Sequence, residues 1–198
     1  MAKFNWKAKP TDDPKWRGGH RHYWNLWNTT HYIIIPFVVL LVVENYLLRG
    51  WLSDERYGHP FSSVDQFWWR IGLALLPDAA ITFIQTWGLC TQHWHPITAL
   101  VSSVALCALW FTVAFLNPFV AYNNEYRFEN DETWEKLCYA EAGFQAVISL
   151  LYAVMAGFAA KGIHVWRKSR GAKYMNVEMN AQKTTSSFEY SHDATARV

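Results

Sequence analysis

Charge, cysteine and recognisable catalytic motifs are all scarce in this chain of 198 residues. Asp, Glu, Lys and Arg make up only 17% of it, the formal net charge is +2, and there are three cysteines. So small a net charge gives no reason to expect a nucleic-acid partner. The sequence has no phosphate-binding Gly-rich loop and no nucleophile elbow, and its Ser, His and Asp residues form no recognisable arrangement. We therefore predict no catalytic residues, no cofactor and a protein that is not an enzyme.

Two further absences concern targeting and thiols. No short apolar stretch with a small-residue cleavage site lies near residue 1, so we expect no cleaved signal peptide. Of Cys90, Cys107 and Cys138, only Cys138 falls near the outer face in the topology derived below. An intramolecular disulfide therefore has no partner on the oxidising side of the membrane.

Long apolar runs, in contrast, are abundant. A hydrocarbon core about 30 Å thick is crossed by about 20 helical residues, and lipid offers no partner for backbone N–H and C=O groups. The sequence therefore predicts an all-α integral membrane protein, a four-helix transmembrane bundle over residues 31–166. An arm of residues 1–30 precedes it, and a polar tail of residues 167–198, expected to be disordered, follows it. The four predicted spans are residues 32–48, 67–90, 97–121 and 138–165.

The chain contains twelve tryptophans, and many of them flank the predicted spans. Indole rings concentrate where hydrocarbon meets headgroups, so these residues are expected to form interfacial belts. Trp110 lies inside the third span, where packing in the core is the simpler interpretation. The residues expected at the lipid interface are Trp24, Trp27, Trp51, Trp68, Trp69, Trp94, Trp134 and Trp166.

Basic residues gather before the first span and after the last one, whereas the segment between the third and fourth spans is acidic. An even number of crossings puts both termini on one side, and the positive-inside bias assigns that side to the cytosol. The basic arm is also expected to attract anionic lipid. We predict a multi-pass protein of the plasma membrane or an endomembrane, with both termini cytosolic.

Ionisable and amide side chains inside spans are costly, so each is a candidate functional site. Glu44 and Arg70 lie at comparable depth in the predicted topology, and we expect them to form an ion pair. The candidate intramembrane polar residues are Glu44, Asn45, Arg70, Asp78, Gln85 and Glu141.

Asp78 is the deepest of these residues and directly follows Pro77. In a functional interpretation it is a proton-titrating or substrate-binding carboxylate, facing a polar cleft with Thr82, Gln85 and Asn117. In a structural interpretation it is a carboxyl group that is protonated or hydrogen-bonded across helices and fixes their packing. The sequence alone leaves both interpretations open.

Histidine pairs with one residue between them, His20 with His22 and His93 with His95, raise the question of a metal site. Such a spacing points two imidazoles the same way only in an extended segment. All four lie on the cytosolic side of the predicted topology, so a shared site is geometrically open. The fuller clusters of membrane di-iron enzymes are absent, and we expect no metal.

The chain resembles the MARVEL-type tetraspan membrane proteins, particularly the small fungal members. The resemblance covers residues 32–166 and lies in the order of spans, the short connection at residues 91–96 and the acidic loop before the fourth span. It is sharpest at residues 134–144, with the sequence WEKLCYAEAGF. The aromatic N-terminal arm and Pro36 depart from the pattern of that family.

The resemblance implies a non-enzymatic, lipid-interacting scaffold that self-associates and organises membrane domains. Small residues favour close helix contacts in lipid, and the fourth span carries a stripe of them. The expected partners are membrane lipids and either further copies of the chain or a larger membrane complex. Two alternatives remain. One is a sterol- or lipid-binding protein or isomerase-like enzyme that uses Glu44 and Asp78 and holds a lipid or sterol. The other is an accessory subunit of a larger membrane complex. The stripe consists of Ala142, Gly143, Ala146, Ala153, Ala156, Gly157 and Ala160.

Overall fold

The computed structural model describes residue 16 and residues 21–53, 64–91, 93–123 and 132–195. The α-helical residues in these ranges form four long helices. The side chains of Trp51, Trp68, Trp69, Arg70 and Trp134 lie outside the described residues, so the expected Glu44–Arg70 ion pair does too. The all-α prediction is confirmed for the described part of the chain. The helices are α1 (Arg21–Ser53), α2 (Val64–Cys90), α3 (Pro96–Asn123) and α4 (Glu132–Thr195).

Three of the helices contain segments long and apolar enough to cross a membrane: His22–Leu47 in α1, Pro96–Phe119 in α3 and Glu135–Gly171 in α4. Their lengths of 26, 24 and 37 residues all exceed the roughly 20 residues that a bilayer requires. These three segments agree with three of the four spans expected from the sequence.

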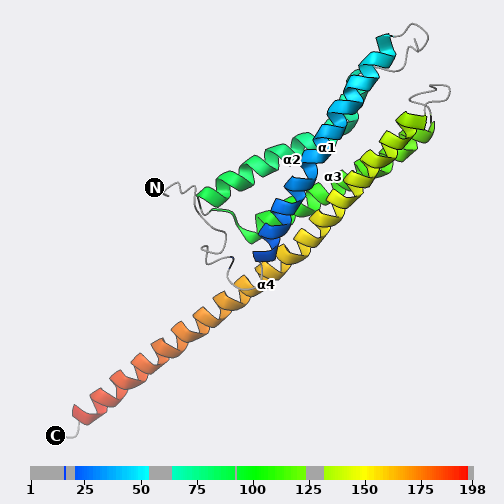
Figure 1. Ribbon diagram of the computed structural model, residues 1–198. Helices are drawn as coiled ribbons and strands as arrows, with labels where there is room; N and C mark the ends of the chain where they lie inside the picture. Colours follow the sequence, from blue (N-terminus) through cyan, green and yellow to red (C-terminus); the bar gives the residue numbers. More distant parts are fainter. Residues whose placement is uncertain (1–15, 17–20, 54–63, 92, 124–131, 196–198) are drawn as a thin grey trace.

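The helices form an antiparallel bundle (Figure 1), in which α3 and α4 pack together most closely. α1 packs mainly on α4 and α2 mainly on α3, while α1 and α2 contact each other less than either contacts its main neighbour. The start of α1, the turn between α2 and α3, and the middle of α4 meet at one end of the bundle. Contacts between His22 and Phe158 and between His95 and Trp166 join them there.

The core is apolar and lies between the four helices, each of which contributes fully buried side chains. Because lipid does not drive apolar side chains inward, their close fit and interhelical hydrogen bonds hold such a bundle together. The largest fully buried side chains are Trp110, Tyr23, Tyr152, Phe37, Leu41, Ile71, Leu106, Ile148 and Met155.

The outward faces of the helices are also apolar. Val39 and Val42 on α1 are each about 60% exposed, and Phe83 on α2 and Phe115 on α3 are 70% and 67% exposed. Monomeric water-soluble proteins rarely expose so continuous an apolar surface. The surface is consistent with helices that contact lipid.

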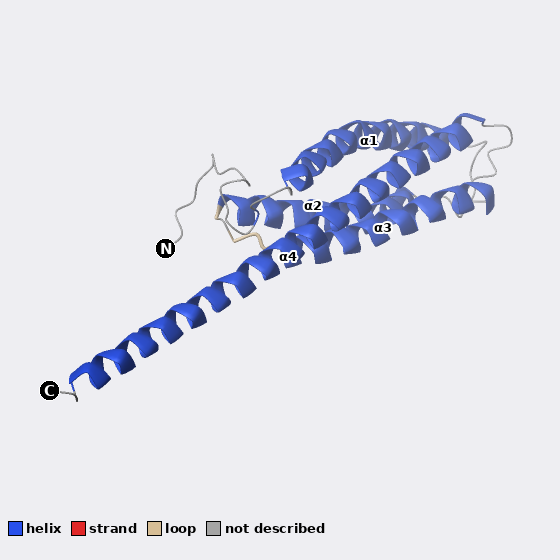
Figure 2. Ribbon diagram, turned by 90° about the horizontal axis from the view of Figure 1, so that it is seen from below, coloured by secondary structure: helices blue, strands red, loops and turns tan. Residues whose placement is uncertain are grey.

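α4 is longer than expected, because it continues to Thr195 as one helix of 64 residues. The tail at residues 167–198 was expected to be disordered, yet most of it is helical. Its sequence offers a physical reason, since residues 167–198 contain no proline and include four Ala, three Lys, two Met, two Glu and one Gln, which favour helix. Figure 2 shows this part of α4 extending beyond the other helices. At the other end of the chain, α1 begins at Arg21, inside the predicted arm.

Candidate functional site

Asp78 lies on the inward face of α2 and is almost completely buried, with 2% of its surface exposed. Its Oδ2 accepts a hydrogen bond from the Trp110 indole N–H at 2.7 Å, and its Oδ1 accepts one from the Tyr152 hydroxyl at 2.8 Å. Thr82, one turn further along α2, donates a third to Oδ1 at 3.2 Å. One carboxylate therefore links α2 to α3 and α4.

Asp78 also satisfies the hydrogen-bond donors of its two partners on α3 and α4. Trp110 and Tyr152 are fully buried, and a buried indole N–H or phenol O–H is costly when it lacks an acceptor. Trp110 comes from α3 and Tyr152 from α4, so the network requires these helices to keep one relative register. This arrangement is what the structural interpretation of Asp78 requires.

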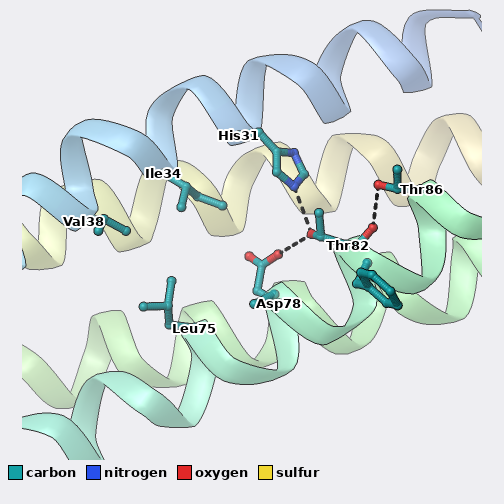
Figure 3. Close-up of a pocket in the computed structure, with 9 residues that line it drawn as sticks. His31, Ile34, Val38, Leu75, Asp78, Thr82 and Thr86 are labelled. Atoms are coloured by element: carbon teal, nitrogen blue, oxygen red, sulfur yellow. Dashed lines mark hydrogen bonds between the residues drawn. The ribbon is translucent and has the colours of Figure 1, made fainter. Parts of the chain in front are cut away.

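His31 extends the network to α1 (Figure 3). Its Nε2 lies 2.9 Å from the Thr82 hydroxyl, and its Nδ1 lies 2.7 Å from the Trp27 carbonyl oxygen one turn earlier. A carbonyl oxygen only accepts hydrogen bonds, so Nδ1 must carry a hydrogen. His31, Thr82 and Asp78 therefore form one hydrogen-bonded chain that runs from the edge of the bundle to its interior.

This chain forms part of the wall of a groove between α1 and α2 with a volume of about 560 Å³, which is open at the side of the bundle. The groove lies between two helices that contact each other less than either contacts its main neighbour. Figure 3 shows Val38 and Leu75 toward one end, and His31, Thr82 and Thr86 toward the other. Its lining residues are His31, Ile34, Val38, Leu75, Asp78, Ala79, Thr82, Phe83 and Thr86.

Gln85 belongs to a separate polar cluster nearer the end of the bundle where α1 begins. Its side-chain N–H donates to the Tyr23 hydroxyl at 2.7 Å, and its carbonyl oxygen accepts from the Trp27 indole. The Tyr23 hydroxyl also lies 3.4 Å from the Ser103 hydroxyl. This cluster connects α1, α2 and α3.

Asn117 and Glu141 belong to a third cluster, between α3 and α4. Asn117 donates to the side-chain oxygen of Gln145 at 2.7 Å, and Gln145 donates to Glu141 at 2.8 Å. All three side chains are buried. The cleft expected around Asp78 thus includes Thr82, while Gln85 and Asn117 each serve another contact.

The two remaining candidates on α1 differ in their surroundings. Glu44 is buried, with 1% of its surface exposed, but it is not among the residues that line the groove. Asn45 is half-buried and accepts a hydrogen bond from Arg49 on its own helix at 3.1 Å. The sequence interpretation that places Glu44 and Asp78 together in one cavity therefore differs from the geometry.

Two of the tryptophans expected to face headgroups are buried instead. Trp24 packs against Trp16, Tyr23 and Trp27 with ring centroids 5.5, 5.3 and 6.1 Å away, and the Trp94 carbonyl accepts from the Trp16 indole. Position near the end of a span fixes the depth of an indole but not the direction in which it points. Here the direction is inward, so the rings close one end of the bundle.

Trp27 and Trp166 are half-buried, which suits an interfacial position better. The guanidinium of Arg170 lies 4.3 Å from the centre of the Trp166 ring, a favourable cation–π arrangement. The other four tryptophans expected at the lipid interface have side chains outside the described residues: Trp51, Trp68, Trp69 and Trp134.

The histidine pairs do not form a metal centre in the described part of the chain. His22 stacks on Phe158, His93 is exposed and His95 packs on Trp166, while His20 lies outside the described residues. Within the described ranges, no group of three or more His, Cys, Asp or Glu side chains could hold a metal ion.

No protein family, curated protein or solved structure matches this chain.

Proposed function

We propose that the chain is an integral membrane protein that crosses the bilayer four times with both termini in the cytosol. In this proposal it acts as a lipid-interacting, self-associating scaffold of the plasma membrane or an endomembrane, without catalytic activity. This function agrees with the resemblance to MARVEL-type tetraspan proteins.

The observation that carries the proposal is the distribution of polar and apolar side chains. Large apolar residues cover the outward faces of all four helices, whereas Asp78, Gln85, Asn117, Glu141 and Gln145 are buried. Hydrogen bonds of Asp78, Gln85 and Asn117 reach other helices, and Glu141 accepts from Gln145 on its own helix. Polar residues of membrane helices favour the bundle interior because the lipid side offers them no partner. The same distribution would be costly in water.

α2 is the proposed fourth crossing. Its 27 residues form a helix about 40 Å long, more than the thickness of the hydrocarbon core. Leu76, Phe83 and Trp87 cover its exposed face, while Asp78 and Gln85 lie on its buried face. Asp78 and Gln85 lower the mean hydropathy of α2, but their side chains are buried and do not face the surroundings of the bundle. This arrangement supports a fourth crossing of the bilayer by α2.

The proposed orientation rests on basic residues at one end of the bundle. Lys161, Arg167, Lys168 and Arg170 are exposed on α4, near the end where α1 begins. Short flanking segments rich in Lys and Arg stay preferentially in the cytosol. This charge distribution supports a cytosolic position for both termini.

Self-association is supported by the outward face of α4. Gly143 and Gly157 are exposed, and a Cβ atom added at either would meet no heavy atom within 4 Å. Ala146, Ala153 and Ala160 are also exposed and follow these glycines at helical spacing. Since small residues let membrane helices approach closely, a second copy of the chain fits this face.

The test compares Gly157→Leu with the wild-type chain by native mass spectrometry with lipids retained. We expect the larger side chain to shift the protein from oligomer to monomer without changing its thermal stability. Ala108→Leu, at an exposed position of α3, adds similar bulk elsewhere and should leave the oligomer intact. A wild-type protein that is monomeric in lipid, or an oligomer unaffected by Gly157→Leu, would contradict the proposed self-association.

A lipid-binding protein is the second candidate, and the groove between α1 and α2 favours it. A volume of about 560 Å³ lies within the range of small-molecule sites. The isomerase-like version is less well supported, because it uses Glu44 and Asp78 together and only Asp78 lines the groove.

A further inference from the structure

We propose that an acidic phospholipid of the cytosolic leaflet binds on the outward face of α4, at Lys161 and Lys168, between two copies of the chain that pair on this face. Its negative headgroup offsets the repulsion between the basic residues of the two copies. This inference rests on the self-association and the topology in the proposed function, and it names the class of lipid that supports the assembly.

The first argument is the position of basic residues around α4. Lys161 follows the exposed Gly157 by four residues, and Lys168 follows Lys161 by seven, so all three lie on one side of the helix. Arg167 follows Ala160 by seven residues and borders the same side. The small-residue face of α4 therefore ends in a basic patch of three exposed residues, Lys161, Arg167 and Lys168.

The second argument is that the basic patch has no carboxylate nearby to neutralise it. The helical stretches that run into this end of the bundle are residues 21–43, 79–123 and 142–177, and none of them contains Asp or Glu. Within the described ranges, the basic patch therefore keeps its positive charge. A surface with an uncompensated charge of one sign attracts ligands of the other sign.

The third argument is the depth of the basic patch in the proposed topology. Figure 1 shows this stretch of α4 at the end of the bundle where α1 begins. The half-buried Trp166 lies between Lys161 and Lys168, which differ in position along the helix by about 10 Å. Indole rings concentrate where hydrocarbon meets headgroups, and a lysine just below this level extends its ammonium group toward it. The basic patch therefore lies at the level of the lipid headgroups.

The fourth argument comes from the pairing of two copies. Copies that insert with the same orientation pair as parallel helices around a two-fold axis, so each residue of α4 comes close to its own counterpart. A pair on the face of Gly143 and Gly157 therefore brings two basic patches together, with three Lys and Arg residues from each copy. Like charges repel more strongly beside an apolar surface than in bulk water. An anion between the patches removes this opposition to pairing.

An acidic phospholipid supplies that anion in the right place. Clusters of about four to eight Lys and Arg residues at the cytosolic surface of a membrane attract acidic lipids, and the two patches together reach this size. The choline group of phosphatidylcholine would instead add a cation. The chains of the lipid can lie along the exposed Val154 and Val147, which precede Lys161 by seven and fourteen residues on the same side of α4. The headgroup then points to the cytosol and the chains to the membrane interior.

The test measures the pairing of the full chain in vesicles of phosphatidylcholine, with and without phosphatidylserine. Energy transfer between donor-labelled and acceptor-labelled copies gives the dissociation constant as the protein is diluted in lipid. We expect pairing to be about tenfold tighter with phosphatidylserine, because the lipid removes the repulsion between the opposed patches. Native mass spectrometry of the same vesicles should show dimers that retain phosphatidylserine.

Two variants that each remove one cation separate a bound lipid from the general surface charge of the vesicle. Lys168→Gln changes the basic patch, whereas Arg170→Gln changes a residue about 200° around the helix, where the guanidinium lies over Trp166. Lys168→Gln should lower the effect of phosphatidylserine on pairing at least about threefold. Arg170→Gln should leave that effect unchanged.

Two double variants test the repulsion itself. Lys161→Gln with Lys168→Gln should pair in phosphatidylcholine alone about as tightly as the wild type pairs with phosphatidylserine, because most of the opposed charge is gone. Lys161→Arg with Lys168→Arg keeps the charge and should behave like the wild type.

Equal pairing of the wild type in the two lipid mixtures would overturn the proposal and leave the proposed self-association intact. Dimers that retain no phosphatidylserine, or equal effects of Lys168→Gln and Arg170→Gln, would overturn it too, because a diffuse surface charge would then explain the lipid dependence. A wild type that stays monomeric in both mixtures would contradict the proposed self-association and, with it, this inference.

Discussion

At the scale of single residues, Asp78 links three helices, because side chains of α3 and α4 donate hydrogen bonds to it. The sequence predicts that a carboxylate so deep in a span faces inward, since lipid penalises it, and it predicts the nearby Thr82. It does not predict Trp110, Tyr152 or His31 as the other members of the network. Those contacts depend on the rotation and register of separate helices, which no local pattern encodes.

Asp78→Asn should therefore fold almost as well as the wild type. The amide oxygen can accept from Trp110, and the amide N–H groups can donate to the hydroxyl oxygens of Tyr152 and Thr82, so only the Tyr152 hydroxyl hydrogen loses its acceptor. We expect a loss of at most about 1 kcal/mol in the free energy of unfolding, within the range of interhelical hydrogen bonds in membranes.

Asp78→Leu is the matched comparison, because it removes the acceptor from three donors at once. It should cost at least about 3 kcal/mol. Reversible unfolding in mixed detergent measures both values. Equal losses in the two variants would show that the hydrogen bonds of Asp78 contribute little. Loss of a lipid-processing activity in a well-folded Asp78→Asn protein would count against the scaffold function.

At the scale of whole elements, the sequence predicts where helices run better than which way their faces turn. Apolar length places the segment Pro96–Phe119 within two residues of its expected bounds, whereas His22–Leu47 begins ten residues earlier than expected and Glu135–Gly171 ends six residues later. Trp24 and Trp94, expected at the lipid interface, have buried side chains, because the flanking position of a residue sets its depth but not the direction of its side chain. The end of α4 is helical where disorder was expected, for another reason. Low hydrophobicity indicates that a segment does not pack against a core, but a segment with sufficient helix propensity can still be helical.

The turn between α2 and α3 depends on close contact at Gly88. Its carbonyl accepts from the backbone N–H groups of His93 and Trp94, and a Cβ added at Gly88 would lie 3.1 Å from the Trp94 ring. Gly88→Leu should displace Trp94 and cost roughly 1–3 kcal/mol of stability, a typical cost of overpacking.

The displacement can be detected through the cysteines. Cys90 and Cys138 are both buried, at opposite ends of the bundle. Maleimide labelling followed by peptide mapping should show faster modification of Cys90 in Gly88→Leu, with Cys138 unchanged. Gly143→Leu is the control, because nothing lies within 4 Å of its added Cβ. Equal rates for Cys90 in both variants would contradict the role assigned to Gly88.

The part of α4 beyond Gly171 should be the least protected portion of that helix. Figure 1 shows it beyond the other helices, and a helix without packing partners is only marginally stable in water. In hydrogen exchange followed by mass spectrometry, its amides should exchange faster than those around Ile148 and Tyr152, which are fully buried. Protection equal to that of the core would indicate that this part packs on a partner.

At the scale of the whole molecule, orientation in the membrane depends on few charges. Reversing Arg167, Lys168 and Arg170 to Glu removes much of the exposed positive charge on α4 near the bundle end, so a fraction of the molecules should insert with the opposite orientation. A glycosylation acceptor inserted between Ser53 and Val64 reports on the side that this connection occupies.

The control keeps the charge and changes the side chains, with Arg167→Lys, Lys168→Arg and Arg170→Lys. It should insert like the wild type. A wild-type chain in which the inserted acceptor stays unmodified, or in which a terminal tag is reached from outside intact cells, would contradict the proposed topology.

The length of α4 has a consequence of its own. At about 1.5 Å per residue, the portion from Gly171 to Thr195 is a rod of up to about 36 Å. In the proposed orientation this rod acts as a spacer that carries Thr195 away from the lipid surface. Any cytosolic molecule that recognises the last turns of α4 would then dock at a distance set by the helix itself, clear of the crowded headgroups.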